Sequence, residues 1–327
     1  MIDLHLHLDG SLSPETALTL AREQGLPLPA GEAAGLRPHL TAPARCRDLA
    51  EYLTFFPLPL SLLQSEWALT YAVAALRREM AQEGLIYAEI RFAPQLHTRR
   101  GLTQCRAVQA AVAGLAGPGV RAQLILCLMR RTGEEAAFND ETLALAPDFL
   151  GRGVCALDLA GDEAAVPTAA FAPLFARARA AGIPFTIHAG EAAGPDSVRQ
   201  ALAMGARRIG HGVRAVEDPA LVQTLIDRGI PLEICPTSND QTGAAPLPRC
   251  PVRPLLRKGA VVTVNTDNRT VSSTTIPHEF AALRRLGLTG QEEGRLLQHA
   301  AGAAFLPEGE KDKLRAAVRA RIDKRGE

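Results

Sequence analysis

The sequence predicts an α/β fold, and within that class a (β/α)8 TIM barrel with extra helices between the first and second strands. Eight short apolar runs alternate with Ala-, Leu- and Arg-rich segments whose apolar residues recur about every 3.6 positions. Such alternation is typical of a parallel sheet. A chain of 327 residues is within the usual length of one barrel, and no Pro/Gly/Ser-rich linker divides it. We therefore expect one domain over residues 1–327.

The elements can be placed from their periodicity. The expected strands cover residues 2–6, 85–94, 122–129, 154–160, 184–189, 207–212, 231–236 and 260–267. The clearest helical patterns cover residues 15–24, 66–82, 168–181, 218–229 and, at the charged end of the chain, 310–327.

The connection between the first two strands is longer than one crossover helix requires. It has about 80 residues, and it includes an apolar stretch within residues 45–70. This stretch either forms a lid over the mouth of the barrel, where it would exclude water, or packs away from the site. The sequence leaves both alternatives open.

Composition excludes several classes of function. With a formal net charge of +1, 47% hydrophobic and 22% charged residues, the chain is an ordinary globular protein without the basic excess of a nucleic-acid binder. We expect no membrane span and no secretory signal, because the apolar windows are short or broken by proline and polar residues. The six cysteines lack C-x-x-C spacing, so we expect reduced thiols and a cytoplasmic protein. No pattern assigns an oligomeric state.

The first strand carries an H-x-H motif. Residues i and i+2 of a strand point the same way, so His5, His7 and Asp9 are expected on one side and the intervening leucines on the other. Two imidazoles on one face can bind one cation, and zinc takes His nitrogen at about 2.0–2.1 Å. The alternative is a pair of ordinary polar side chains.

Polar residues also end three other expected strands. They are His188, His211 and Asp267; Gly190 lies two residues after His188, and Gly210 and Gly212 flank His211. A barrel gathers its functional groups at the carboxyl ends of its strands, so we expect these side chains to converge. Gly190 allows the chain to turn out of the strand before Glu191. We therefore expect Glu191 over the same cavity, as a proton-transfer group.

The sequence also bears on the kind of metal centre. Binuclear barrel hydrolases commonly bridge their two metals with a carboxylated lysine, and this chain has no lysine before Lys258. We therefore expect a mononuclear site formed by His5, His7, His188 and Asp267, with one open position for water.

Seven motifs follow one another along nearly the whole chain: "DLHLHLDGSLSPET", "IYAEIRFAPQLHT", "ALDLAGDE", "IHAGEAAGPDS", "RIGHGV", "EICPTSN" and "VVTVNTDN". Together, and in this order, they resemble the adenosine deaminase family of the amidohydrolase barrels. The resemblance implies one Zn²⁺ ion per chain, a purine nucleoside as the partner, and a place in purine salvage.

The resemblance also implies a role for each site residue. His5, His7, His188 and Asp267 match the zinc ligands, Glu191 the proton donor to purine N1, and His211 the residue that orients the attacking hydroxide. Gly161 matches the backbone amide at purine N3, and Asp9 the carboxylate at the ribose 5′ end.

The implied reaction is hydrolytic deamination of adenosine and 2′-deoxyadenosine to inosine and 2′-deoxyinosine plus ammonia. Glu191 must enter as a neutral acid, which requires a pKa raised by burial. Hydroxide activated by zinc attacks C6 while Asp267 accepts its proton, and ammonia leaves.

One residue departs from a common form of the family pattern. Many members have a second aspartate after the ligand aspartate, assigned to purine N7, whereas this chain has Asn268. An amide can donate to N7 without being protonated, so purine binding is retained on physical grounds. The preference for adenosine over other purines is put in doubt.

Three alternatives remain. The first is deamination of another 6-aminopurine, such as adenine, an N6-substituted or a futalosine-type nucleoside. The second is hydrolysis of esters or amides, and the third is an inactive zinc-binding protein. The missing lysine bridge and the presence of Glu191 weigh against the second, and the complete set of site residues against the third.

Two further pairs of residues have open roles. Glu89 and Arg91 alternate on the second strand and could form a buried ion pair. Ser238 and Asn239 either cap a turn or line the purine site.

Overall fold

The computed structural model describes residues 1–326, with side chains up to residue 322, and within them eight parallel strands form two four-stranded sheets. The first sheet has the order β1-β2-β3-β4 and the second β5-β6-β7-β8. The strands are β1 (Ile2–His7), β2 (Tyr87–Phe92), β3 (Arg121–Met129), β4 (Val154–Ala160), β5 (Thr186–Ala189), β6 (Arg208–His211), β7 (Leu232–Ile234) and β8 (Val262–Val264). The predicted α/β class and all eight strands are confirmed.

Isolated parallel bridges join the two sheets at both edges. Leu157 of β4 pairs with Phe185 just before β5, and Leu6 of β1 pairs with Asp267 after β8. At the second edge the amide of His7 donates to the carbonyl of Asp267 at 2.7 Å, and the amide of Asp267 donates to the carbonyl of His5 at 2.7 Å.

Two strand boundaries differ from the prediction in a way that matters for the site. β1 ends at His7, so Asp9 is not on the strand but begins a 3-10 turn over Asp9–Ser11. β8 ends at Val264, three residues before Asp267. Asp267 has a φ of 60°, which no regular strand accommodates. Asp9 and Asp267 therefore both lie beyond the ends of their strands, where the backbone is no longer extended.

Five helices fill the long connection between β1 and β2, as predicted. They are α1 (Pro14–Gln24), α2 (Ala33–Leu40), α3 (Leu49–Leu53), α4 (Pro57–Leu62) and α5 (Glu66–Gln82). Local sequence explains their starts: the side chains of Ser13, Asp48 and Ser65 accept backbone amides at the N-termini of α1, α3 and α5. Gly25 ends α1 in the left-handed conformation, with a φ of 63°.

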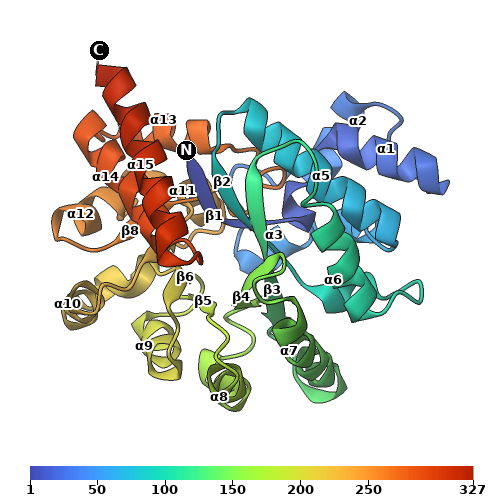
Figure 1. Ribbon diagram of the computed structural model, residues 1–327, viewed down its shortest axis with the longest axis horizontal. Coiled ribbons are helices and arrows are strands. Elements are labelled where there is room, and N and C mark those ends of the chain that lie inside the picture. The colour runs from blue at the N-terminus through green and yellow to red at the C-terminus, as the bar shows by residue number, and fades with distance from the viewer. Residues whose placement is uncertain (327) are drawn as a thin grey trace.

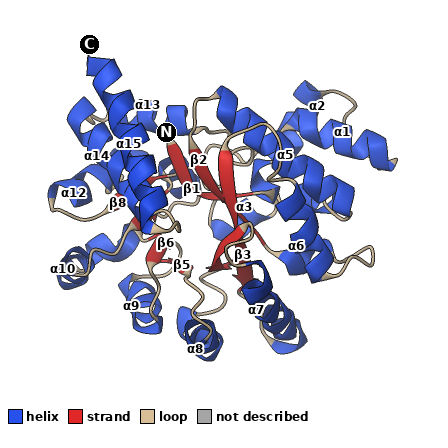
Figure 2. Cartoon of the chain, in the orientation of Figure 1, coloured by secondary structure: helices blue, strands red, loops and turns tan. Residues whose placement is uncertain are grey.

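The remaining helices surround the strands, which lie in the middle of the molecule (Figures 1 and 2). They are α6 (Gln104–Ala113), α7 (Ala137–Phe149), α8 (Ala172–Ala180), α9 (Pro195–Met204), α10 (Pro219–Asp227), α11 (Pro236–Gln241), α12 (Val252–Arg257), α13 (Ile276–Arg285), α14 (Gly290–Ala303) and α15 (Glu308–Gly326). α14 packs against β8 and β1, and α15 packs on α14. Residue 327 of the expected C-terminal helix lies outside the described residues.

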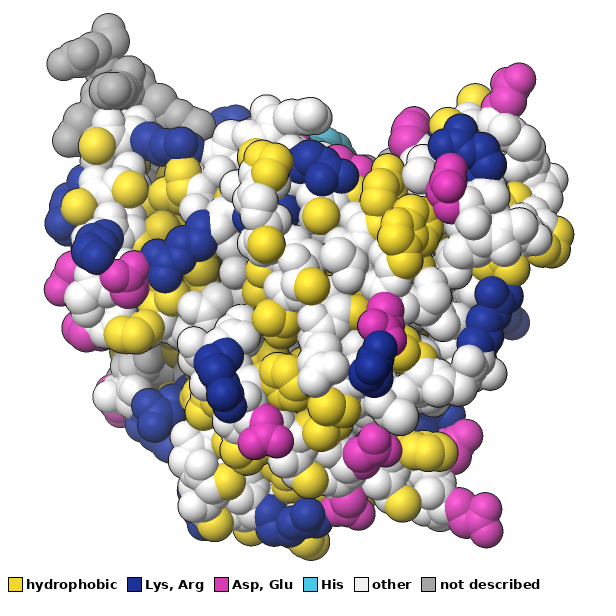
Figure 3. Space-filling view, turned by 45° about the vertical axis from the view of Figure 1, so that its right-hand side comes forward, with side chains coloured by type: hydrophobic (Ala, Val, Ile, Leu, Met, Phe, Trp, Pro, Cys, Tyr) yellow, Lys and Arg dark blue, Asp and Glu magenta, His cyan; other side chains and the backbone are white. Residues whose placement is uncertain are grey.

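The main hydrophobic core runs from Ile2 to Val318 and includes Leu4 and Leu6, on the outward side of β1, and Leu8 just after the strand. None of the described helices is long and apolar enough to cross a membrane. On the face drawn in Figure 3, basic and acidic side chains are interspersed and do not form a field of one sign. This agrees with the near-zero net charge.

Candidate metal centre and active site

A cavity of about 290 Å³ lies at the carboxyl ends of the strands. Small-molecule sites commonly have volumes of about 300–1,000 Å³, so the cavity fits a compact ligand. Eight of the nine expected site residues line it: His7, Asp9, Gly161, His188, Glu191, His211, Asp267 and Asn268. The ninth, His5, is fully buried below them. The structure therefore brings all nine residues together.

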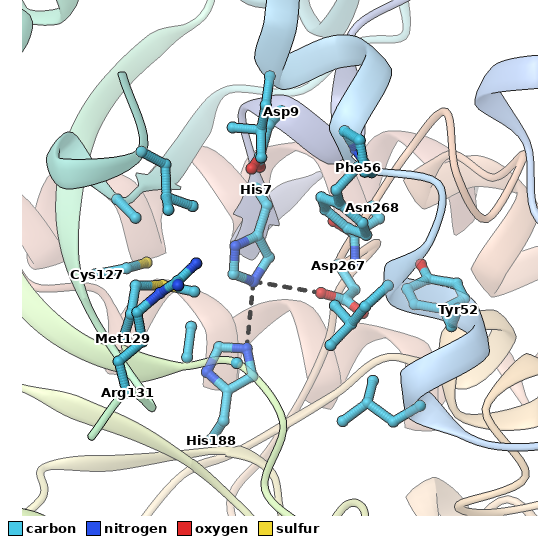
Figure 4. Close-up of a pocket in the computed structure, with 18 of the residues that line it drawn as sticks. His7, Asp9, Tyr52, Phe56, Cys127, Met129, Arg131, His188, Asp267 and Asn268 are labelled. Atoms are coloured by element: carbon cyan, nitrogen blue, oxygen red, sulfur yellow. Dashed lines mark hydrogen bonds and ion pairs between the residues drawn. The ribbon is translucent and has the colours of Figure 1, made fainter. Parts of the chain in front are cut away.

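Three imidazoles converge on the carboxylate of Asp267. His5 Nε2 lies 3.4 Å and His7 Nε2 lies 3.5 Å from Asp267 Oδ1. His7 Nε2 lies 3.2 Å from His188 Nε2, and Figure 4 shows dashed lines that join His7 to both His188 and Asp267. Nitrogen and carboxylate donors so close together, with no cationic side chain between them, are what a divalent metal requires.

Distance alone admits a fifth group at this centre. One ligand atom from each of His5, His188, His211 and Asp267 lies within 4.8 Å of the others, and this group includes His211 but not His7, so His211 competes with His7 for a place among the ligands. The hydrogen bonds of His5, His188 and His211 indicate which form of each of these three rings faces the centre.

His5 and His188 are held in the form that binds metal. The Nδ1 atom of His5 lies 2.9 Å from Glu233 Oε2, and that of His188 lies 3.1 Å from Asp158 Oδ1. Because a carboxylate only accepts, Nδ1 of each ring donates, and Nε2 is left with its lone pair facing the centre. His5 Nε2 is buried and has no hydrogen-bond partner among the described residues, which fits a missing cation.

His211 is held in the opposite form. The side-chain oxygen of Asn239 accepts the amide of Cys235 at 3.3 Å, so the amide nitrogen of Asn239 faces His211 Nδ1, at 2.9 Å. The amide donates, Nδ1 accepts, and the proton of a neutral His211 ring therefore sits on Nε2. A protonated nitrogen cannot coordinate a metal but can donate a hydrogen bond.

Burial keeps most of these rings neutral. It lowers the pKa of His7 and His211 well below the usual value for imidazole, and it also lowers the pKa of His188. For His5, burial acts in the same direction, but Asp267 and Glu233 outweigh it and raise its pKa. His7 and His188 therefore offer neutral imidazoles beside the carboxylate of Asp267, which are donors that zinc binds.

Asp267 is fixed from both backbone and side chain. In addition to its two backbone bonds to β1, its Oδ2 accepts the hydroxyl of Ser238 at 2.5 Å. Asp267 and His211 have left-handed backbones, with φ of 60° and 59°. Non-glycine residues adopt this conformation at a cost of order 1–3 kcal/mol, and such residues cluster at functional sites.

Glu191 faces the cavity as a carboxyl group whose surroundings favour the neutral form. Burial, followed by the negative charges of Asp267 and Glu163, raises the pKa of Glu191 well above its usual value. Its Oε1 accepts the hydroxyl of Thr242 at 3.3 Å, and its Oε2 lies 3.5 Å from His211 Nε2. A neutral acid over a cavity can donate a proton to a bound ligand.

The opposite wall of the cavity is apolar and comes from α3 and α4. It is formed by Leu49, Tyr52, Leu53, Phe56, Pro57 and Leu60. The hydroxyl of Tyr52 lies 2.7 Å from that of Ser272, which ties α3 to the loop after β8. Of the two alternatives for residues 45–70, the wall over the site is the one observed.

The expected substrate contacts occupy the rim. Asp9 uses Oδ1 to accept the amide of Gly10 at 3.0 Å, and burial raises its pKa to about 6. Asn268 packs against Gly10 so closely that a Cβ there would lie 1.8 Å from Asn268 Oδ1. Gly161 has a φ of 107°, a conformation that favours glycine.

Two sequence interpretations need correction. Glu89 and Arg91 do not pair with each other: Arg91 binds Asp158 at 2.9 Å and Glu233 at 2.5 Å, and Glu89 binds Arg208 at 2.7 Å. The alternation of side chains along β2 predicted that both residues are buried. Their ion-pair partners lie on other strands, which the pattern of a single strand cannot show.

Ser238 and Asn239 do not line the cavity, although the Asn239 side chain does accept the amide of Cys235 at the start of α11. They hold Asp267 and His211 instead.

Sequence reasoning missed the residues that orient the site. Glu233 and Asp158 hold imidazoles, Asn239 sets the His211 proton, and Thr242 and Glu163 contact the Glu191 segment. Glu233 and Asp158 lie in predicted strands and are charged, which is the one signal that could have marked them, because a buried charge needs a partner.

Comparison with known proteins agrees with this geometry. The family model described as "Adenosine deaminase" matches residues 1–321. A protein named adenosine deaminase from Haemophilus ducreyi is 49% identical over 98% of this chain and 96% of its own length. One from Enterococcus faecalis is 40% identical over 96% of this chain and 94% of its own length.

Solved structures share the fold across almost the whole chain. An adenine deaminase from Arthrobacter aurescens has a TM-score of 0.87 at 28% identity and covers 98% of both chains. The apo N6-methyl-AMP deaminase from Arabidopsis thaliana has a TM-score of 0.82 at 27% identity, over 98% of this chain and 96% of its own. With a family match over residues 1–321, two relatives at 40% and 49% identity and a buried His/Asp centre, the chain belongs to the adenosine deaminase family.

Proposed function

We propose that the protein is an adenosine deaminase that converts adenosine and 2′-deoxyadenosine to inosine and 2′-deoxyinosine, with release of ammonia. The observation that carries the proposal is a buried glutamic acid of raised pKa, Glu191, facing a cavity that holds a His/Asp centre. The named function of relatives at 37–49% identity supports the same substrate.

His5, His7, His188 and Asp267 would hold one zinc ion. The hydrogen bonds of His5 and His188 leave Nε2 free, while the bond from Asn239 leaves the proton of His211 on its Nε2, so His7 is preferred as the third imidazole. When bound, zinc would supply a water of lowered pKa, near ~7, close to the substrate.

Three side chains around that centre, those of Glu191, His211 and Asp267, each have a different role in proton transfer. Glu191 donates its proton to purine N1, which makes C6 electrophilic. His211 donates Nε2–H to the attacking oxygen, and Asp267 accepts the proton that the attacking water loses. Asp267 then passes this proton to the 6-amino group, the C6–N bond breaks and ammonia leaves, while the C6 hydroxyl returns a proton to Glu191 and becomes the carbonyl. The apolar wall from α3 and α4 excludes bulk water, which strengthens each of these electrostatic interactions.

The rim residues would orient the nucleoside. The amide of Gly161 donates to purine N3, Asn268 donates to N7, and Asp9 contacts the ribose 5′ hydroxyl. A carboxylate at this position repels a 5′-phosphate, which favours nucleosides over nucleotides.

We also propose that the eight strands close into one (β/α)8 barrel and that the chain works as a single domain in the cytoplasm. The bridges at both sheet edges and the continuous core support the first two statements. The cysteines of the described chain are free thiols, as a reducing compartment requires.

A spectroscopic assay tests the proposal. Purified protein of known metal content is mixed with adenosine, 2′-deoxyadenosine, adenine, adenosine monophosphate and an N6-methyl nucleoside, and the ultraviolet difference spectrum is followed. We expect rapid loss of the adenosine signal, abolished by chelation and restored by zinc.

Glu191→Gln should lower kcat by roughly 10²–10⁴-fold, the usual contribution of a general acid. Glu217→Gln, a matched change at an ion-paired glutamate on the surface, should leave kcat within about twofold.

Two outcomes would contradict the proposal. If adenosine stays intact while adenine or the N6-methyl compound reacts, the substrate is another 6-aminopurine, as the named activities of the fold neighbours allow. If metal is bound and nothing on the panel reacts, the protein is not a deaminase of these purines.

A further inference from the structure

Glu163 is a buried carboxylate with an unusual set of partners. It follows β4 and is 2% exposed. Its Oε1 accepts the amide of Gly190 at 2.8 Å, and its Oε2 accepts the amides of Glu191 at 3.0 Å and Ala193 at 2.9 Å. The hydroxyl of Ser197 also donates to Oε1. None of the ion pairs within the described residues includes Glu163, and its four hydrogen-bond donors are three backbone amides and one hydroxyl.

These donors belong to the segment that carries the proposed acid. One of them is the amide of Glu191 itself, and the other two amides lie one residue before and two residues after it. Glu163 therefore anchors the backbone of Glu191 directly, from outside the cavity, since it is not among the lining residues.

The segment is tightly packed around Gly190. Gly190 has a φ of 71°, and a Cβ at that position would lie 2.7 Å from Val198. Only a carboxylate offers two acceptor oxygens and no donor, which is what four converging N–H and O–H groups require. An amide or an apolar side chain of similar size would leave donors buried without partners.

The same hydrogen-bond chain continues to the metal centre. Thr168 Oγ1 lies 2.7 Å from Ser197 Oγ, and Arg130 donates to Thr168 at 2.9 Å and to the carbonyl of His188 at 2.6 Å. The positions of Glu191 and of the His188 backbone are thus set by one connected network.

We propose that Glu163 is a positioning residue for the reaction, which holds the Glu191 carboxyl in place for proton transfer to the purine. The inference rests on the proposed function, since it needs Glu191 as the acid. It predicts that Glu163 contributes to the chemical step and little to the binding of the nucleoside.

The test uses the zinc-loaded, full-length enzyme and its Glu163→Gln variant. A misplacement of about 1 Å can lower a rate by roughly 100-fold. We expect kcat for adenosine to fall by about that factor, while KM stays within about threefold. The affinity for 1-deazaadenosine, which has no N1 to protonate, should stay within about threefold as well. In the Glu191→Gln background the same change should have little further effect on kcat, because both residues act on one step.

Asp162→Asn is the matched control. Asp162 precedes Glu163 in the same turn, and its Oδ1 accepts the amides of Ala164 and Ala165 and none from the Glu191 segment. We expect this variant to keep kcat within about twofold. Glu163→Asp, which retains the charge but is one methylene shorter, provides a milder variant in case Glu163→Gln does not fold, and it should also lower kcat at constant KM.

The outcomes separate the two proposals. If the unmodified enzyme does not deaminate adenosine, the proposed function fails. If it does, but the folded Glu163 variants keep its kcat and lose only thermal stability, Glu163 is a structural residue and the inference is overturned. The inference is overturned too if kcat and the affinity for 1-deazaadenosine fall together.

Discussion

Glu279 is a buried carboxyl group of α13 that the proposed chemistry does not use. It is fully buried and accepts the hydroxyl of Thr274 at 2.5 Å and the amide of Thr237 at 3.1 Å. Burial outweighs these bonds and raises its pKa from 4.5 to about 7. The folded protein therefore keeps a proton that the unfolded chain loses, and folding becomes less favourable as pH rises from about 4.5 to about 7.

Glu279→Gln, which imitates the protonated acid, should remove this cost. The stabilisation should be near zero at pH 4.5 and should grow to at most about 3 kcal/mol above pH 7. Urea unfolding at several pH values measures it. A gain in stability that does not depend on pH would show that ionisation of Glu279 is not the cause.

At the level of single residues, the sequence predicted the groups that face the cavity better than those that hold them. His5 and His7 follow from strand alternation, and His188 and Glu191 from the end of a strand. Asn239 and Glu163 could not be found in this way, because their roles depend on contacts with His211 and Glu191 that lie 28 residues away along the chain.

Among the elements, α3 and α4 give the cavity its apolar wall. Helix α3 is tied to the rest of the site through the hydroxyl pair of Tyr52 and Ser272 and through packing of Tyr52 in a small separate core with Leu49 and Val271. The periodicity of the sequence predicted extra helices in this connection. Their place over the cavity depends on tertiary packing, which periodicity does not contain.

Tyr52→Phe tests the wall. It keeps the ring in the small core and removes the hydrogen bond to Ser272, whose net value is about 0.5–1.5 kcal/mol. We expect KM for adenosine to rise by about 2–10-fold with kcat within about twofold, measured by steady-state kinetics. Tyr71→Phe, on a ring stacked with exposed Trp67, is the control and should change neither constant. An unchanged KM in Tyr52→Phe would show that the tie is not needed for binding.

For the whole molecule, Arg208 joins parts of the fold that are distant in sequence. Its guanidinium binds Glu89 of β2 at 2.7 Å and Glu233 of β7 at 2.5 Å, and it donates to the carbonyl of Ala303 at 3.0 Å. It also lies 3.8 Å from the ring centre of Phe305. One buried side chain thus connects both sheets with the C-terminal helices.

Removing this charge should destabilise the protein strongly. Arg208→Met leaves two buried carboxylates without a shared cation, and we expect the free energy of unfolding to fall by about 3–5 kcal/mol. Arg207→Met, at the exposed neighbouring position, should change it by less than about 0.5 kcal/mol. Urea unfolding measures the free energy of unfolding of both variants. If the two variants lose similar amounts of stability, Arg208 does not have this role.

The order and parallel direction of the strands could be predicted from the sequence because each apolar run and each helical period is a local signal. The edges between the two sheets could not. Each edge depends on a single bridge, Leu157 to Phe185 at one edge and Leu6 to Asp267 at the other. The second bridge joins residues from opposite ends of the chain.

The left-handed backbones of His211 and Asp267 have a consequence for engineering the protein. Glycine at either position would relieve the strain, so a library selected only for thermal tolerance should accumulate glycine there. Both changes would remove groups assigned to the chemistry. Selection for thermal stability alone would therefore yield stable but inactive variants. A screen for stabilised variants has to measure catalytic activity at the same time.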